Sequence, residues 1–360
     1  MTPASLPPDR KVDKPKGPRT PMPDWPPDNP RILIVISMKN EGPYLLEWLS
    51  WHKAIGVTDF VVFSNHCVDG TDHMLDRLDA MGELTHLPNP ALLYDRRGYQ
   101  PIALRYAHDL PVFRQADFVI SMDADEFINV RVPGHRLTDL FAALPAFDAL
   151  SMSELNHGAN GHTAFSPGWL TETCPGHMTE RPRDFRARTG VKTITRFGPK
   201  FERVGNHRPY TKDGRQDVVW LDGSGNPAPE FAERDTRNGI DCRGRFDLVS
   251  LDHFALRSVD AFLLKHMRGD AVTDGNNVTQ KYWRKRNRAE ATTSDLAPGA
   301  ARARTVFQRL SVDKVLMKLH RSAVAHHRRL AAEANQTPEL MALRDWIFEN
   351  AWYDRLPPSK

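Results

Sequence analysis

Short apolar runs and amphipathic stretches alternate along the first half of the chain. The apolar runs have the length and β-branched character of buried strands, and the stretches between them repeat apolar residues at helical spacing. The predicted strands are 32–36, 60–63, 84–87, 118–122 and 148–152, and the predicted helices are 43–55, 71–81 and 100–114. This alternation predicts an α/β fold: a Rossmann-like, mostly parallel sheet with helices on both faces.

The pattern differs toward the two ends and in the middle of the chain. Residues 1–30 hold ten of the 28 prolines and predict a disordered leader. Residues 153–245 are loop-rich, which is typical of functional segments. A strand at 248–251 and a helix at 259–268 restore the regular pattern. From about residue 301 the period is helical again.

These changes predict three regions. Residues 1–30 form the leader, residues 31–290 the main domain, and residues 291–360 a helical C-terminal extension. Within the main domain, the change of pattern separates residues 31–130 from residues 148–290.

Composition narrows the class of protein. With 40% hydrophobic and 26% charged residues the chain is globular, and a net charge of +4 is too mild for a nucleic-acid partner. Three cysteines without a C-x-x-C spacing favour a reducing compartment, and no apolar run reaches the ~18 residues of a membrane span. We therefore expect a cytoplasmic protein with possible peripheral membrane contact. The basic cluster at 281–288 could meet nucleotide phosphates or a lipid headgroup, or be a solvated helix face.

Two carboxylates follow the strand at 118–122. Asp123 and Asp125 are two residues apart, so they would point the same way if the extended geometry continued past the strand. Paired carboxylates at a strand end suit Mg²⁺ or Mn²⁺, and the carboxyl ends of parallel strands are where open α/β sheets bind ligands.

Three segments, at residues 39–41, 64–71 and 123–127, carry a resemblance to the family 2 glycosyltransferases, which are nucleotide-diphospho-sugar transferases of the A-type fold. Residues Lys39-Asn40-Glu41 resemble the "K-N-E" opening of one bacterial branch. Residues 64–71 (SNHCVDGT) are similar to its "D-N-x-S-x-D-G-T" loop, with Ser64 and Cys67 in place of Asp and Ser. Residues 123–127 (DADEF) match its "D-x-D-E-F", and residues 205–209, 252–258 and 265–269 resemble its later motifs.

The resemblance implies that residues 31–130 form the nucleotide-sugar half of the domain and residues 148–290 the acceptor half, and it implies roles for particular residues. Implied nucleotide-sugar contacts are Lys39, Asn40, Glu41, Asn65, Asp69, Asp123, Lys265 and Arg268. Implied metal ligands are Asp123, Asp125 and, as the third, His253, because an imidazole also suits Mn²⁺. A catalytic carboxylate base is needed on the acceptor side, and the candidates are Glu154 and Asp184.

The resulting hypothesis is a metal-dependent, inverting glycosyltransferase of the hexosyltransferase kind, acting in polysaccharide biosynthesis. It would use a nucleotide-diphosphate sugar, with a UDP-sugar favoured, and a saccharide or other hydroxyl acceptor. Two alternatives stay open: a metal-dependent nucleotidyltransferase, and a non-catalytic carbohydrate-binding protein with the same fold. The sequence has neither a Walker loop nor a G-x-G-x-x-G motif, which argues against a kinase or a dehydrogenase.

Overall fold

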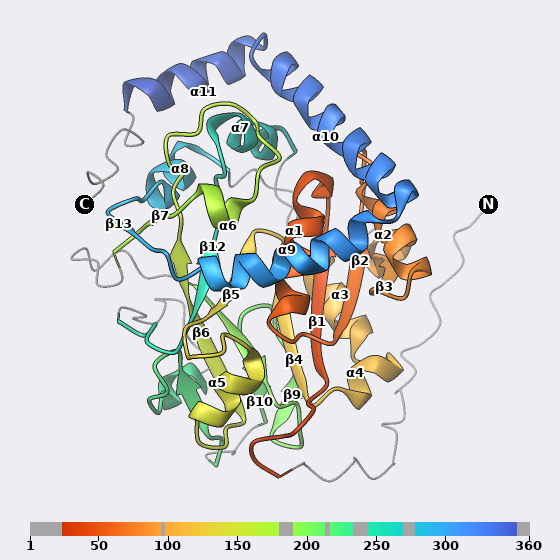
Figure 1. Cartoon of the computed structure of the whole chain (residues 1–360), viewed down its shortest axis with the longest axis vertical. Helices are drawn as coiled ribbons and strands as arrows, with labels where there is room; N and C mark the ends of the chain where they lie inside the picture. Colours follow the sequence, from red (N-terminus) through yellow and green to blue (C-terminus); the bar gives the residue numbers. More distant parts are fainter. Residues whose placement is uncertain are drawn as a thin grey trace, which may run out of the picture.

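A computed structural model describes residues 24–94, 98–179, 190–212, 217–232, 244–268 and 278–350. In these residues a mixed sheet of nine strands forms the centre of the molecule (Figure 1). The strands run in the order β3-β2-β1-β4-β8-β6-β12-β5, and β11 pairs with β6. They are β1 (Ile32–Met38), β2 (Asp59–Ser64), β3 (Thr85–Pro88), β4 (Phe118–Met122), β5 (Glu126–Val130), β6 (Ala149–Asn156), β8 (Val191–Thr195), β11 (Trp220–Asp222) and β12 (Val249–His253).

Most strand pairs in this sheet are parallel. The strands β3, β2, β1 and β4 run parallel to one another, and so do β11, β6 and β12. Strand β8 is antiparallel to β4 and β6, and β5 is antiparallel to β12. The predicted α/β fold with a mostly parallel sheet is confirmed.

Helices cover both faces of the sheet, and small elements complete the chain. The helices are α1 (Gly42–Ala54), α2 (Thr71–Ala80), α3 (Tyr99–Ala107), α4 (Pro111–Gln115), α5 (Leu137–Ala143), α6 (Leu170–Thr173), α7 (Val259–Arg268), α8 (Gln280–Arg286), α9 (Ala297–Ser311), α10 (Lys314–Ala334) and α11 (Pro338–Glu349). Short 3₁₀ turns lie at Pro90–Tyr94 and Pro229–Ala232, and small strands are β7 (Gly176–His177), β9 (Phe201–Arg203), β10 (Tyr210–Thr211) and β13 (Ala291–Thr292).

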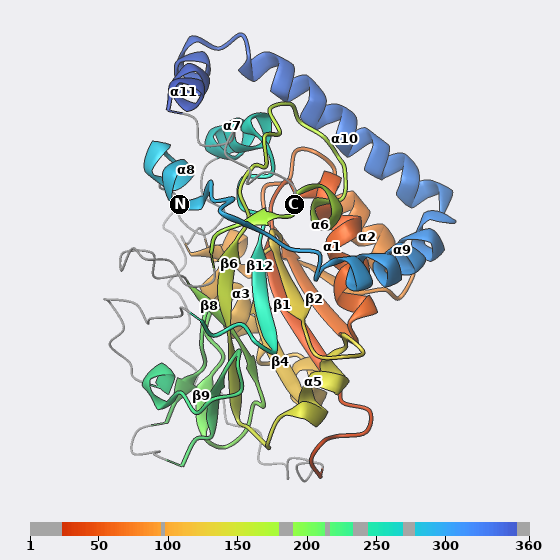
Figure 2. The ribbon, with the colours of Figure 1, turned by 60° about the vertical axis from the view of Figure 1, so that its left-hand side comes forward.

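The apolar runs of the sequence divide between two cores. In β1, Ile32 and Ile34 pack in the larger core, which also contains residues of α1, α2 and α9. Leu33 and Val35 point to the other face and pack with residues of α3 and α4. Figure 2 shows α1, α2 and α9 on one side of the sheet and α3 on the other. The continuous apolar run of β1 thus reflects burial on both faces.

Two local expectations differ from the structure. The helix predicted over 100–114 is broken into α3 and α4, because Pro111 lacks an N–H and its ring would clash with the carbonyl of Ala107 in a continuous helix. The extended geometry expected through residues 123–125 ends at Met122, where a turn leads to β5. This turn is closed by Glu126, whose carboxylate accepts a hydrogen bond from the Asp123 backbone N–H and whose own N–H donates to the Asp123 carbonyl.

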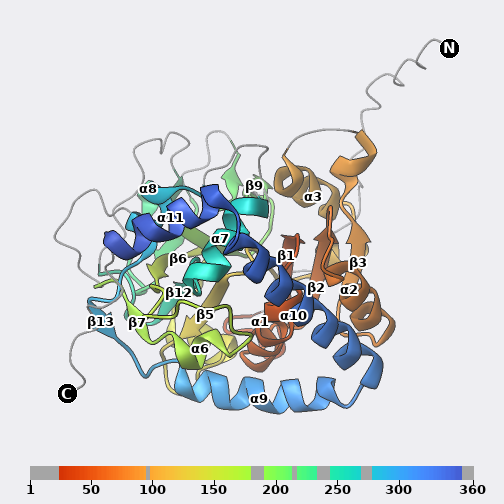
Figure 3. The ribbon, with the colours of Figure 1, turned by 90° about the horizontal axis from the view of Figure 1, so that it is seen from above.

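The C-terminal helices pack onto the main domain. Helix α9 lies along α1, and its Gly299 approaches Trp51 so closely that a Cβ at Gly299 would lie 2.5 Å from the indole ring. Helix α10 then crosses the end of the molecule where β1 and β2 finish, in contact with α1, α2 and α7 (Figure 3). No helix in the described residues is long and apolar enough to cross a membrane.

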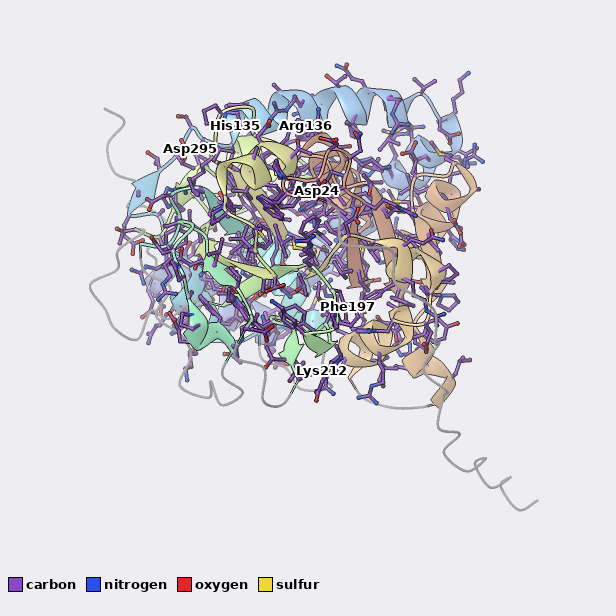
Figure 4. The ribbon with its side chains drawn as sticks, turned by 90° about the horizontal axis from the view of Figure 1, so that it is seen from below. Asp24, His135, Arg136, Phe197, Lys212 and Asp295 are labelled. Atoms are coloured by element: carbon purple, nitrogen blue, oxygen red, sulfur yellow. The ribbon has the colours of Figure 1, made fainter. Side chains whose placement is uncertain are left out.

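The described chain begins before the predicted domain boundary at residue 31. Trp25 donates a hydrogen bond from its indole N–H to the carbonyl of Leu144 at 2.8 Å and contacts the rings of Phe118, Phe141 and Phe147. Figure 4 labels the neighbouring Asp24 on the face opposite to α10. The packed structure therefore includes Trp25, whereas residues 1–23 of the predicted leader lie outside the described residues.

Candidate functional site

Asp123 and Asp125, in the turn after β4, pair with different cations. Asp123 Oδ2 lies 3.1 Å from Nζ of Lys192 on β8, and its Oδ1 accepts a hydrogen bond from Gln100 at 3.0 Å. Asp125 Oδ2 accepts a hydrogen bond at 2.7 Å from Lys265 on α7. Burial raises the pKa of Asp125, but Lys265 and His253 more than offset it and hold the pKa well below its usual range. Asp125 is therefore an anion at neutral pH.

His253 lies at the end of β12, between two carboxylates. Its Nε2 is 3.4 Å from Asp125 Oδ1, and its Nδ1 is hydrogen-bonded to Glu154 Oε1. Arg286 also binds the Glu154 carboxylate and donates to Asn156 at 2.7 Å. Burial and Arg286 lower the pKa of His253, but the two carboxylates raise it to about 10. Without a ligand, the imidazole is protonated and joins Asp125 to Glu154.

The pair Asp125 and His253 fits a divalent cation. Two neighbouring ligands at about 2.1 Å in an octahedral site are about 3 Å apart, close to the 3.4 Å between Asp125 Oδ1 and His253 Nε2. A metal-binding histidine commonly donates its other ring N–H to a carboxylate, as His253 does to Glu154. Among the described residues, however, no group of three or more His, Cys, Asp or Glu side chains is arranged to hold a metal ion. The remaining ligands would have to come from a substrate and water.

Glu41 gathers two arginines at the same end of the sheet. Its Oε2 accepts from Arg257 at 2.8 Å and its Oε1 from Arg268 at 2.6 Å. Burial raises the pKa of Glu41, but these arginines lower it below its usual value. The guanidinium of Arg257 also lies 3.9 Å from the centre of the Tyr44 ring. Glu41 thus positions two cations, and its predicted contact with the nucleotide sugar stays a prediction.

Positive charge exceeds negative charge around Asp125. Four permanent cations contact three carboxylates here, and protonated His253 adds a fifth positive charge; the cations are Arg257, Lys265, Arg268 and Arg286, and the carboxylates are Glu41, Asp125 and Glu154. Such an excess, partly shielded from water, attracts an anionic ligand with several oxygens.

The predicted nucleotide contacts in the first two loops have varied surroundings. Lys39 Nζ donates to the carbonyl of Arg268 at 3.4 Å, so the "K-N-E" loop lies against the end of α7. Asn40 adopts φ 55° and accepts a hydrogen bond from the Val68 N–H at 2.8 Å, which fixes the second loop to the first. Asn65 is 2% exposed, and neither polar atom of its side chain has a partner in the described structure.

Asp69 is held by groups from three helices. It accepts hydrogen bonds from the N–H of Gly42 at the start of α1 and from the N–H and hydroxyl of Thr71 at the start of α2, and it contacts His327 Nε2 of α10 at 2.9 Å. Burial raises the pKa of Asp69, but His327 and Thr71 lower it overall. The structure gives Asp69 an anchoring role, and its predicted contact with the nucleotide base stays a prediction.

Of the two predicted catalytic bases, the structure describes the surroundings of Glu154 but not those of Asp184. Glu154 is 6% exposed and is bound by His253, Arg286 and the N–H of Gly190, which lower its pKa well below the usual value in spite of burial. A carboxylate with so low a pKa is a weak proton acceptor, so these contacts favour an orienting role for Glu154. Asp184 lies outside the described residues.

Sequence reasoning did not assign site roles to Lys192, Arg286 and Tyr282. Lys192 is fully buried between Asp123 and Glu126, and burial raises the pKa of Glu126 to about 8 although Lys192 lowers it. Tyr282 accepts a hydrogen bond from Lys265 at 3.0 Å. The four-residue spacing of Tyr282 and Arg286 places both on one face of α8. This spacing is the sequence signal that one face of the basic helix could point toward the site and not into solvent.

A pocket with a cavity volume of about 210 Å³ lies beside Lys265. Residues from the first loop, from the segment after β12, from α7 and from α10 surround it. They are Asn40, Tyr44, Val68, Phe165, Ala255, Arg257, Ala261, Leu264, Lys265, Met267, Arg268, His326, His327 and Leu330. The pocket is mostly apolar with a cationic end, and this end is shared with the Asp125 cluster.

The chain resembles a plant glycosyltransferase in part of its sequence. A protein of Oryza sativa subsp. japonica described as a glycosyltransferase family 92 protein is 24% identical over 157 residues, which are 42% of this chain. The match spans only 26% of the rice protein. No protein-family model matches the chain. The chain is thus glycosyltransferase-like over the matched part, and the predicted membership of family 2 is not confirmed.

Solved structures of Staphylococcus aureus TarS also align with the chain. TarS 1–349 in complex with UDP is 18% identical and covers 46% of this chain and 47% of its own, with a TM-score of 0.28. A second structure of TarS 1–349 is 12% identical over 85% of this chain and 91% of its own, with a TM-score of 0.29. TM-scores this low carry no argument about fold or function, which here rest on the sheet and the site themselves.

Proposed function

We propose that this chain is a metal-dependent glycosyltransferase. It would move a sugar from a nucleotide-diphosphate sugar to a hydroxyl of a saccharide acceptor, with inversion, and a UDP-sugar is the first donor to test. The observation that carries the proposal is the pairing of Asp125 with His253 inside an excess of cations, at the carboxyl end of a mostly parallel sheet. The partial similarity to a glycosyltransferase supports it.

The cations would serve the departing diphosphate. When the glycosidic bond breaks, negative charge grows on the diphosphate oxygens, so cations held in place stabilise the transition state more than the bound substrate. Lys265 and Arg268 lie on one face of α7, and Arg257 lies just before this helix. Hydrogen bonds to Glu41 hold Arg257 and Arg268, so these two side chains need little reorganisation when the substrate arrives.

Asp125 and His253 would hold Mn²⁺ or Mg²⁺, which supplies further charge stabilisation on the diphosphate. His253 can bind a metal only through a neutral Nε2, so Nε2 would have to lose its proton. Nδ1 would keep its own proton and donate it in the hydrogen bond to Glu154. When a phosphate binds, Lys265 would exchange its contact with Asp125 for one with the phosphate and keep its contacts with Tyr282 and the Ala255 carbonyl. Asp123, paired with Lys192, would act through ribose or bound water.

The acceptor hydroxyl must lose a proton during inverting transfer. The contacts of Glu154 favour an orienting role for it beside His253, so Asp184 is the better of the two carboxylates to test. Asp184→Asn should lower turnover while leaving the affinity for nucleotide unchanged, because the base does not touch the donor. A variant with normal turnover would exclude this assignment.

Thermal unfolding in the presence of donors tests the proposed function. The full chain would be heated with UDP-, GDP- and ADP-sugars, each with and without Mn²⁺. We expect one nucleotide class to raise the midpoint only when Mn²⁺ is present, and Asp125→Ala to abolish this rise, with a cooperative ligand-free melt showing that the variant is folded. If no nucleotide raises the midpoint of the wild type, the proposed donor class is wrong.

A further inference from the structure

Helix α10 belongs to the C-terminal extension, which lies outside the segments that resemble glycosyltransferases, yet it forms part of the pocket beside Lys265. Building on the proposed function, we infer that α10 is one wall of the nucleoside-diphosphate site. In this arrangement Leu330 and His326 face the nucleoside, and the cations of α7 face the diphosphate. The C-terminal extension is thus part of the donor site.

Specific contacts fix α10 to the two loops that open the pocket. Nε2 of His327 contacts Asp69 at 2.9 Å, and Asp69 in turn accepts from the N–H of Gly42. Gly42 has no room for a side chain, because a Cβ there would lie 2.6 Å from the Cβ of Ala323 on α10. The helix therefore sits directly on the start of α1, and Figure 3 shows it passing over that helix.

The pocket has two ends of different chemistry. At one end Arg257, Lys265 and Arg268 supply positive charge. The rest is lined mainly by apolar side chains, which include Phe165, Leu264 and Leu330. A nucleoside diphosphate has the same division, with an anionic group at one end and a flat, weakly polar base at the other.

The polar groups near α10 also suit a base. His327 stacks on Phe165, with ring centroids 5.6 Å apart, and this gives the pocket a flat wall. His326 Nε2 is buried and has no hydrogen-bond partner in the described residues, so it can meet a polar edge of a base. The cavity of about 210 Å³ is smaller than the roughly 300–1,000 Å³ of a site for a whole ligand. It therefore suits the nucleoside, while the diphosphate extends past Lys265 to Asp125.

Calorimetric titration of the full chain with UDP and with pyrophosphate, each with Mn²⁺, tests the inference. Leu330→Trp fills the pocket from α10 and should weaken UDP binding by at least about tenfold, while pyrophosphate binding, which needs only the cations, stays unchanged. The matched control is Ala332→Trp, which adds the same side chain at an exposed position about 200° around the helix. It should bind both ligands as the wild type does.

A smaller substitution, His326→Ala, keeps the test informative if Leu330→Trp does not fold. His326→Ala should also weaken UDP but not pyrophosphate, and the ligand-free melting midpoint of each variant shows whether it is folded. If folded Leu330→Trp and His326→Ala bind UDP like the wild type, or lose UDP and pyrophosphate alike, α10 is not the nucleoside wall. If the wild type binds UDP, GDP and ADP no more tightly than it binds pyrophosphate, the inference is also wrong. If it binds none of these ligands, the proposed function itself fails.

Discussion

Replacing Lys265 by methionine should change the affinities for metal and for diphosphate in opposite directions. The ammonium of Lys265 lies 2.7 Å from Asp125 Oδ2, and the two side chains are 18% and 12% exposed. Methionine keeps most of the length of the side chain and removes its charge. Asp125 is then left with His253 as its remaining cationic contact, while the diphosphate loses one of its cations.

The size of both effects follows from this geometry. Two unit charges about 4 Å apart attract by about 4 kcal/mol at an effective dielectric constant of 20, and a hydrogen bond to a charged group contributes about 1.5–3 kcal/mol after desolvation. We therefore expect Lys265→Met to bind Mn²⁺ alone about tenfold more tightly, because no ammonium competes for Asp125. At saturating Mn²⁺, the same variant should bind UDP and pyrophosphate about 10- to 100-fold more weakly.

Isothermal titration measures these affinities separately. Lys285→Met is the matched control, because it removes the same charge from an exposed position on α8. It should leave both affinities near those of the wild type. If Lys265→Met weakens Mn²⁺ and diphosphate together, or leaves both unchanged, Lys265 does not lie between the metal site and the diphosphate.

Three further predictions concern the histidine and the stability of the fold. His253→Gln should reduce the affinity for Mn²⁺ at least about tenfold with little loss of stability, and an unfolded variant would favour a structural histidine instead. Burial raises the pKa of Glu47 to about 7 despite hydrogen bonds from Leu170 and Thr171, so the folded state holds this proton more tightly than the unfolded chain. Urea unfolding should therefore show the wild type losing up to about 3 kcal/mol more than Glu47→Gln between pH 4.5 and 8; equal pH profiles would contradict this. Trp25→Ala should lower the free energy of unfolding by about 2–3 kcal/mol, and an unchanged urea midpoint would show that the indole adds no stability.

The regular part of the fold was accessible from the sequence. Strands β1, β2 and β4 are continuous apolar runs because each is buried on both faces, and α1 and α2 carry apolar residues at helical spacing. Strand β5 was missed because it follows directly on the acidic turn. Among the described residues it pairs with β12 alone, which is more than 110 residues further along the chain and leaves no local signal.

The sequence predicted many of the residues that form the candidate site but not which of them form salt bridges with one another. The acidic turn, His253 and the α7 cations stand out in the sequence, whereas the salt bridges between Asp125 and Lys265 and between Glu41 and Arg257 join residues 140 and 216 positions apart. Such pairs depend on how the strands are ordered in the sheet. The crossing of α10 over the pocket depends likewise on contacts between residues far apart in the chain, such as Ala323 with Gly42 and His327 with Asp69.

The most direct test of the proposed glycosyltransferase is the release of nucleoside diphosphate from a panel of nucleotide sugars, measured with Mn²⁺ and a mixture of saccharide acceptors. The wild type should consume at least one donor and produce a new glycoside, detected by mass spectrometry. Asp125→Asn, which removes the charge but keeps the shape, should be slower by about a hundredfold or more while its ligand-free melting midpoint stays close to that of the wild type. Equal rates for the two proteins, or a wild type that consumes no donor in the panel, would contradict the account.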